Sequence, residues 1–152
     1  MKTAQQLRKL ELLSAQARAA IDQWVAKYPP EEKQSAVMAA LRIVQEEKGS
    51  LSTELMDAIA GYLEMEPISV YEVATFYSMY DLKPVGRHKI SVCTNISCML
   101  CGSADVMRHL TEKLGISAGE TTQDGKFILK EVECLAACAR RGCRRVRRKR
   151  GR

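Results

Sequence analysis

Four cysteines in two pairs constrain what this chain can fold into more than any other feature of its sequence. The first pair, Cys93 and Cys98, stands in SVCTNISC, and the second, Cys134 and Cys138, stands in VECLAAC. Each pair ends a strand-like run, so a fold that brings the two following loops together brings the thiolates together as well. Thiolates are the soft ligands that iron–sulfur clusters and structural zinc require. The pattern therefore predicts that these cysteines bind one metal ion or cluster.

The spacing within the pairs favours a [2Fe-2S] cluster over zinc. Structural zinc sites prefer tight C-x2-C knuckles. The C-x4-C and C-x3-C spacings of this chain open wider loops, which fit a two-iron cluster better than one tetrahedral ion.

Three alternatives stay open on the residues alone. The first is a zinc-stabilised, non-catalytic binding module that holds nucleic acid with a basic tail. The second is a set of disulfides, although no export signal accompanies the cysteines. The third is a thiol–disulfide oxidoreductase that uses Cys98 and Cys101, because these two have the C-x-x-C spacing of such enzymes.

Several motifs together resemble one known family. They are CTNISC followed by MLCGS, then TQDGKF, VECLAAC and, further upstream, VYEVATFYSMY, and the resemblance covers roughly residues 5–139. On these motifs the chain resembles the thioredoxin-like [2Fe-2S] subunit of NADH:quinone oxidoreductase, respiratory complex I, known in bacteria as the E subunit. Related chains serve NAD-linked hydrogenases and formate dehydrogenases.

The resemblance implies an electron-transfer subunit of an oxidoreductase and translocase, with one [2Fe-2S] cluster on Cys93, Cys98, Cys134 and Cys138. The cluster would pass single electrons to and from the flavin that oxidises NADH. FMN and NADH are expected on a partner subunit, because this chain has neither a GxGxxG motif nor a P-loop, and no complete active site of its own. The expected partners are that flavin- and NADH-binding subunit and the iron–sulfur subunit of the peripheral arm. The resemblance places them on the cytoplasmic side of the inner membrane.

Hydrogen bonds to sulfur and burial tune the reduction potential of such a cluster. We expect the backbone amides of residues 94–97 and 135–137 to donate these hydrogen bonds. Cys101 lies beside the first pair and Cys143 lies in the basic tail, and neither has the spacing of a ligand in the family.

The charge of the chain is concentrated at one end. The net charge is +6, but residues 140–152 contain nine Arg and Lys and no acid, so residues 1–139 carry 15 basic and 18 acidic groups. The body of the protein is therefore mildly acidic, which disfavours nucleic acid as its partner. No apolar run approaches the length of a membrane span, and Arg8, Lys9 and Glu11 interrupt any signal peptide, so we expect a cytoplasmic chain.

The hydrophobic pattern predicts an α+β chain, with a helical bundle in residues 1–83 before a thioredoxin-like α/β domain in residues 84–139. Apolar residues recur every three or four positions in the first part, the period of amphipathic helices. Residues that cap or break helices mark the ends of four expected helices, over residues 3–27, 30–49, 50 or 52 to 63, and 69–80. Ser69 and Glu72 form a capping box at the start of the fourth helix. The last helix carries the aromatic residues Tyr71, Phe76, Tyr77 and Tyr80, which we interpret as core packing.

Residues 84–139 follow a different period. After a linker over residues 81–89, we expect a strand over 89–93, a helix from the cap Ser103 to Gly115, and a strand over 127–133 after a turn. Folds of this kind carry their sites on the loops that follow the carboxyl ends of the strands.

The resemblance stops after Cys138. Where the family continues with two strands and a closing helix, residues 139–152 are ARRGCRRVRRKRGR. We therefore expect a fold that is incomplete at its C-terminus, with unpaired strand edges and a disordered basic tail over residues 140–152. Two interpretations of the tail are open: an out-of-frame reading of GC-rich DNA, and a basic segment for an acidic partner or nucleic acid.

Overall fold

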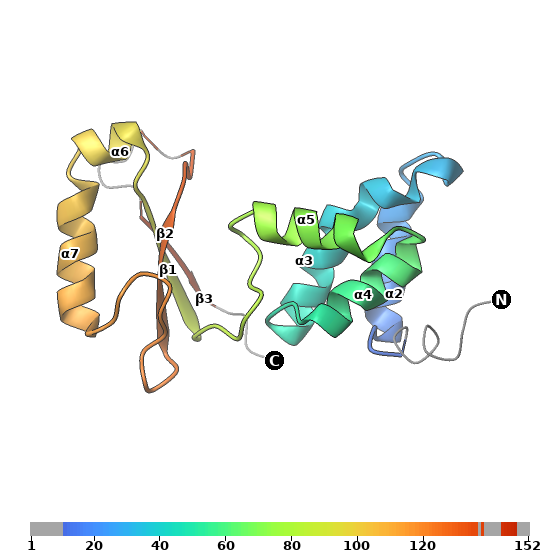
Figure 1. The fold of residues 1–152 in the computed structure, drawn as a ribbon, viewed down its shortest axis with the longest axis horizontal. Helices are drawn as coiled ribbons and strands as arrows, with labels where there is room; N and C mark the ends of the chain where they lie inside the picture. Colours follow the sequence, from blue (N-terminus) through green and yellow to red (C-terminus); the bar gives the residue numbers. More distant parts are fainter. Residues whose placement is uncertain (1–10, 137, 139–143, 149–152) are drawn as a thin grey trace. The chain divides into compact units, whose positions relative to one another are not determined.

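The computed structural model describes residues 11–136, 138 and 144–148. The chain divides into two compact units, Met1–Pro84 and Val85–Arg152, coloured blue to green and green to red in Figure 1. The first unit contains helices and the second contains helices and a sheet. Each unit has a hydrophobic core of its own.

Five helical segments make up the described part of the first unit. They are α2 (Ala15–Val25), the 3-10 helix η1 (Pro30–Ala36), α3 (Val37–Lys48), α4 (Thr53–Leu63) and α5 (Pro67–Phe76). The hydroxyl of Ser14 accepts from the backbone N–H of Ala17 at the start of α2, and Ser52 does the same for Leu55 in α4. Gly49 ends α3 with a φ of 88°, which a residue without Cβ adopts readily.

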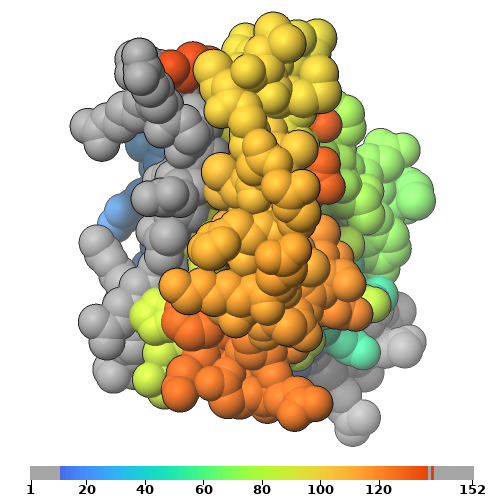
Figure 2. All heavy atoms as spheres, turned by 90° about the vertical axis from the view of Figure 1, so that its left-hand side faces the viewer, coloured from blue at the N-terminus to red at the C-terminus, as the bar shows by residue number. Residues whose placement is uncertain are grey.

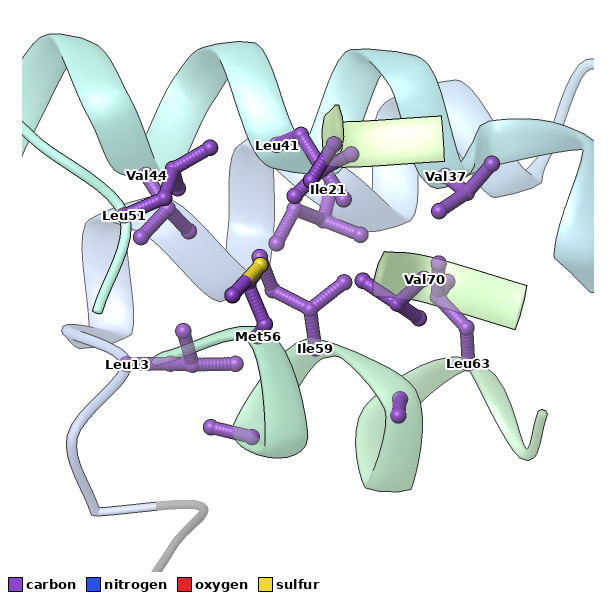
Figure 3. Close-up of a cluster of buried hydrophobic side chains, with 14 of the residues drawn as sticks. Leu13, Ile21, Val37, Leu41, Val44, Leu51, Met56, Ile59, Leu63 and Val70 are labelled. Carbon is purple, nitrogen blue, oxygen red and sulfur yellow. The ribbon is translucent and has the colours of Figure 1, made fainter. Parts of the chain in front are cut away.

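The apolar faces of these helices meet in one core (Figure 3). Ile21 of α2, Leu41 of α3, Ile59 of α4 and Val70 of α5 are fully buried there. The recurrence of apolar residues at three and four positions therefore identified the buried side of α2, α3 and α4. Because the core contains one face of every helix, its packing holds the short helices in place.

The first predicted helix is wrong at its start. The structure has a turn and a bend over residues 11–13 and begins α2 at Ala15, because Ser14 caps the helix there. Residues 3–10 of this predicted helix lie outside the described residues. The second helical segment begins at Pro30, as predicted. It starts as a tighter 3-10 helix, which leads into α3.

The last predicted helix of this unit is wrong at both ends. It begins at Pro67, because proline fits the first helical position, where no N–H partner is needed. It ends at Phe76, since Tyr77 adopts an extended conformation. The aromatic stripe is therefore not all core: Phe76 is 80% exposed, whereas Tyr80 is buried and donates to the carbonyl oxygen of Met38 over 2.9 Å.

Truncation of a core residue should show how much this helical core contributes to the stability of the protein. Ile59→Ala should lower the free energy of unfolding by about 2–5 kcal/mol, because the residue is fully buried and leaves a cavity. The matched control is Ile68→Ala, since Ile68 is an isoleucine of α5 that is 61% exposed. Urea unfolding followed by circular dichroism measures the free energy of unfolding of both variants. Equal decreases in the two variants would contradict the assigned core.

The second unit is built on a three-stranded sheet of order β2-β1-β3. Its elements are β1 (His88–Cys93), α6 (Ile96–Leu100), α7 (Ser103–Leu114), β2 (Phe127–Val132) and β3 (Arg144–Arg148). Strands β1 and β2 are parallel, with Cys93 opposite Val132, and α7 lies along one face of the sheet (Figure 1). Leu110 and other apolar residues of α7 pack on Ile90 and Leu129 of the sheet.

Gly86 shows how closely the chain enters this sheet. A Cβ at this position would lie 2.9 Å from the backbone carbonyl carbon of Phe127, so only glycine fits without displacing the backbone. The next two residues, Arg87 and His88, donate to the carbonyl oxygens of Gly125 and Lys126. The parallel pairing of β1 with β2 therefore begins with backbone contacts that a side chain at position 86 would disturb.

Three predictions for this unit need correction. The cap of α7 is Gly102, with a φ of 86°, and Ser103 is the first residue of the helix. A short helix, α6, follows Cys93 where a loop was expected. The edge of β1 was expected to be unpaired, but β3 pairs with it in antiparallel register, with Val146 opposite Ile90. Strand pairing uses backbone groups, so an arginine-rich segment supplies it as well as an apolar one.

In the part of the chain that the structure describes, each helix is too short or too polar to cross a membrane.

Candidate metal centre

The parallel pairing of β1 and β2 carries both cysteine loops to one end of the sheet. Cys93 is the last residue of β1 and lies opposite Val132, the last residue of β2. The backbone N–H of Thr94 donates to the carbonyl oxygen of Val132 over 3.1 Å, so the pairing extends just past the strands. Cys134 follows Val132 by two residues. The predicted placement of the cysteines after the carboxyl ends of the strands is therefore confirmed for Cys134, whereas Cys93 lies within β1 as its last residue.

The first cysteine pair forms a buried cluster. Cys93 and Cys98 are 1% and 7% exposed, and Leu135 from the second loop packs against them. Helix α6 produces this arrangement, because its single turn brings Cys98 back toward the end of β1. The helix lies at the surface of the unit, beyond the end of α7 (Figure 2, yellow above orange). Its other residues Ile96, Met99 and Leu100 are exposed.

The second cysteine pair lies at the surface. Cys134 and Cys138 are both exposed. The sulfur of Cys134 accepts a hydrogen bond from the backbone N–H of Ala136 over 3.3 Å. Ala136 has a φ of 52°, in the left-handed region, and this conformation turns the loop tightly after Cys134.

The described residues contain no group of three Cys, His, Asp or Glu side chains in position to hold a metal ion. The structure thus brings Cys93 and Cys98 together but does not add a third ligand to them within that range. The assignment of all four cysteines as ligands remains a prediction.

Hydrogen bonds favour the thiolate form of Cys93, although this side chain is buried. Burial raises the pKa of this thiol, but the backbone N–H of Asn95, the thiol of Cys98 and the backbone N–H of Leu135 donate to it and lower the pKa below its ordinary value. The carboxylate of Glu133 acts in the opposite direction. A thiolate is the form that binds metal, so this environment suits a ligand.

The amide donors expected from the sequence are confirmed in part. Asn95, Leu135 and Ala136 donate to cysteine sulfurs, and all three lie in the predicted segments. The N–H of Thr94, by contrast, pairs with Val132. Ala137 lies outside the described residues.

One contact between the two loops was missed in the sequence. The side-chain N–H of Asn95 donates to a carboxylate oxygen of Glu133 over 3.2 Å. The two residues are far apart in sequence, and nothing in the spacing of the motifs pairs them. The only sequence signal is that each polar side chain is within two residues of a cysteine, Cys93 for one and Cys134 for the other.

The residues at this end of the sheet fit an iron–sulfur cluster. All candidate ligands are thiolates, the ligands that [2Fe-2S] clusters use. Backbone amides already point at the sulfurs of Cys93 and Cys134, as they would to stabilise the negative charge of a cluster. A parallel strand pair covered by a helix, with Cys93 at the end of one strand and Cys134 just after the other, is the arrangement expected of a thioredoxin-like iron–sulfur protein.

The chain belongs to the thioredoxin-like [2Fe-2S] ferredoxin family, which residues 21–146 match. It is 46% identical over 121 residues to the second E subunit of the NADH-quinone oxidoreductase of Rhizobium meliloti (strain 1021), an alignment that covers 80% of this chain and 71% of the relative. It is 49% identical over 115 residues to the NADH-quinone oxidoreductase E subunit of Rickettsia bellii (strain RML369-C), covering 75% of this chain and 69% of the relative. The resemblance drawn from the motifs is confirmed.

A solved structure supports the fold. The NAD+-reducing [NiFe]-hydrogenase in its H2-reduced state is similar with a TM-score of 0.60 and 18% identity. The similarity covers 72% of this chain and only 18% of the hydrogenase chain, and at this identity it concerns the fold alone.

Serine substitution at each cysteine tests the ligand assignment. Serine at Cys93, Cys98, Cys134 or Cys138 should remove or distort the cluster, because an alcohol replaces a thiolate ligand. Serine at Cys101 or Cys143 should leave it intact, and these two variants are the matched controls. Iron and acid-labile sulfide content, with the electron paramagnetic resonance signal of the reduced protein, measure the outcome. Loss of the cluster in Cys101→Ser alone would show that the assignment is wrong.

Proposed function

We propose that this chain is the [2Fe-2S] electron-transfer subunit of an NADH-quinone oxidoreductase, the counterpart of the E subunits that it resembles. The observation that carries the proposal is the 46% and 49% identity to two proteins of that name, over three quarters or more of this chain. The aligned length of each exceeds two thirds of the relative, so the likeness extends well beyond the cysteine motifs. The chain contributes electron transfer to the complex and has no complete active site of its own.

Cys93, Cys98, Cys134 and Cys138 would hold the cluster in this proposal. When bound, a [2Fe-2S] cluster accepts and releases one electron at a time. Burial of Cys93 and Cys98 excludes water from one side of the site, and exposure of Cys134 and Cys138 leaves the other side open to a partner. The backbone N–H groups of Asn95, Leu135 and Ala136 donate to the sulfurs and stabilise their negative charge.

The proposal assigns FMN and NADH to a partner subunit. Its partners are this flavin- and NADH-binding subunit and the iron–sulfur subunit of the peripheral arm, on the cytoplasmic side of the inner membrane. We assign residues 1–83 to a helical-bundle domain and residues 84–139 to the cluster domain, both of which contribute to docking. Of the basic segment 140–152, residues Arg144–Arg148 form β3 and so belong to the sheet of the cluster domain.

The identities favour a quinone-linked complex over the corresponding subunit of a hydrogenase or formate dehydrogenase. The hydrogenase similarity has 18% identity and supports only the fold. A zinc-stabilised module that holds nucleic acid remains the alternative from another class, and metal content separates it from the proposal. Two irons and two labile sulfides per chain support the proposal, whereas stoichiometric zinc without sulfide contradicts it.

The dependence on a flavin subunit gives a direct functional test. The isolated, cluster-loaded chain should oxidise no NADH, because it has no flavin. With the flavin subunit of a related NADH-quinone oxidoreductase added, NADH should reduce the cluster, and its visible absorbance should bleach anaerobically. The control is the same mixture without the flavin subunit. NADH oxidation by this chain alone would count against its role as an electron-transfer subunit.

A further inference from the structure

The contact between Asn95 and Glu133 links the two cysteine loops directly. The side-chain amide of Asn95 donates to the Glu133 carboxylate over 3.2 Å. Asn95 follows Cys93 by two residues, and Glu133 immediately precedes Cys134. The contact therefore joins a residue beside the first cysteine pair to a residue beside the second.

This contact lies where the backbone pairing of the strands ends. The ladder between β1 and β2 finishes at Cys93 and Val132, and the Thr94 N–H makes one more bond to Val132. Beyond that point Asn95 leads into α6, and Glu133 leads to Cys134. The side-chain hydrogen bond continues the strand pairing by one step, into the segment that carries the cysteines.

Asn95 occupies a position where its side chain would ordinarily serve its own helix. It is the N-cap residue of α6, with an extended conformation, and asparagine is among the best residues for this position because its side chain accepts from the first turn. Here the Asn95 side chain makes no capping hydrogen bond to α6. Its amide instead crosses to the other loop and binds Glu133.

Glu133 also places a negative charge beside the cysteine loops. Reduction adds one negative charge to a [2Fe-2S] cluster, so a fixed carboxylate nearby disfavours reduction and lowers the potential. The hydrogen bond from Asn95 keeps this charge at the junction of the loops.

We propose that Asn95 and Glu133 are a positioning pair that sets the separation of the two cysteine pairs and holds one negative charge beside the cluster. The inference rests on the proposed function, since it assigns both residues a role toward the [2Fe-2S] cluster. The pair acts through the cysteines and touches no substrate. It explains why the side chain of a helix-capping asparagine turns away from its helix.

Two variants separate the charge from the hydrogen bond. Glu133→Gln keeps an oxygen that accepts from Asn95 but removes the charge, so cluster retention should be unchanged and the reduction potential should rise. Asn95→Ala keeps the charge but removes the hydrogen bond, so the cluster should be lost at least about three times faster to a chelator. Glu131→Gln is the matched control, because Glu131 is an exposed glutamate of β2 two residues earlier. Its potential and retention should equal those of the wild type.

The double variant Asn95→Ala with Glu133→Ala, compared with each of the two single alanine variants, tests whether the residues act together. Its loss of cluster should be no faster than that of the more impaired single variant, because a hydrogen bond can be broken only once. Additive losses would show that the residues act independently and would overturn the pairing. An unchanged potential in Glu133→Gln, measured by anaerobic redox titration, would overturn the assigned role of the charge.

Hydrogen exchange in the protein without a cluster distinguishes this inference from the proposed function. In Asn95→Ala, the Thr94 amide should exchange faster than in the wild type, because the loops separate more readily past the last strand pair. Unchanged exchange would overturn the positioning role. If the wild type binds zinc and no sulfide, the proposed function fails, and so does the predicted effect on the reduction potential. The hydrogen-exchange comparison still decides whether the contact between Asn95 and Glu133 holds the two loops together.

Discussion

The parallel pairing of β1 with β2 is the interaction on which the site depends. It aligns the last residue of one strand, Cys93, with the last residue of the other, Val132, and so delivers both cysteine loops to the same end of the sheet. A slip of one residue would turn every side chain of β2 to the opposite face of the sheet and separate Leu129 from the apolar residues of α7. The packing of that helix therefore fixes the register, and the register fixes where the loops start.

The two cysteine pairs differ in their surroundings, and the difference has a physical cause. Cys93 ends a central strand and Cys98 lies on the inner side of a single helical turn, so both are buried against Leu135. Cys134 and Cys138 follow an edge strand and are exposed. Such a site would protect a cluster on one side and present it on the other, which suits a protein that exchanges electrons with a partner.

Much of the fold was predictable from local patterns. The predicted strand boundaries agree with β1 and β2 to one residue, because alternating apolar residues and a flanking turn mark them. The predicted stops at Gly49 and Gly115 are also confirmed, since both glycines adopt left-handed conformations that end helices.

The features of the fold that the sequence did not predict are of three kinds. Helix α6 is too short for a periodic signal. Strand β3 forms through backbone bonds that its arginines do not reveal. Phe76 is exposed as the last residue of α5, where the extended residue Tyr77 ends the helix. The sequence motifs predicted amide donors at the sulfurs, but the contact of Asn95 with Glu133 depends on strand register and so appears only in three dimensions.

X-ray absorption spectroscopy of the reconstituted protein tests the central claim most directly, namely that the two cysteine loops together hold one [2Fe-2S] cluster. The iron edge should show a first shell of sulfur alone, with a neighbouring iron in the second shell, because the thiolates and bridging sulfides complete the coordination of both irons. The zinc edge should be absent. A sulfur shell around zinc, or an iron shell that contains oxygen or nitrogen without an iron neighbour, would contradict the account.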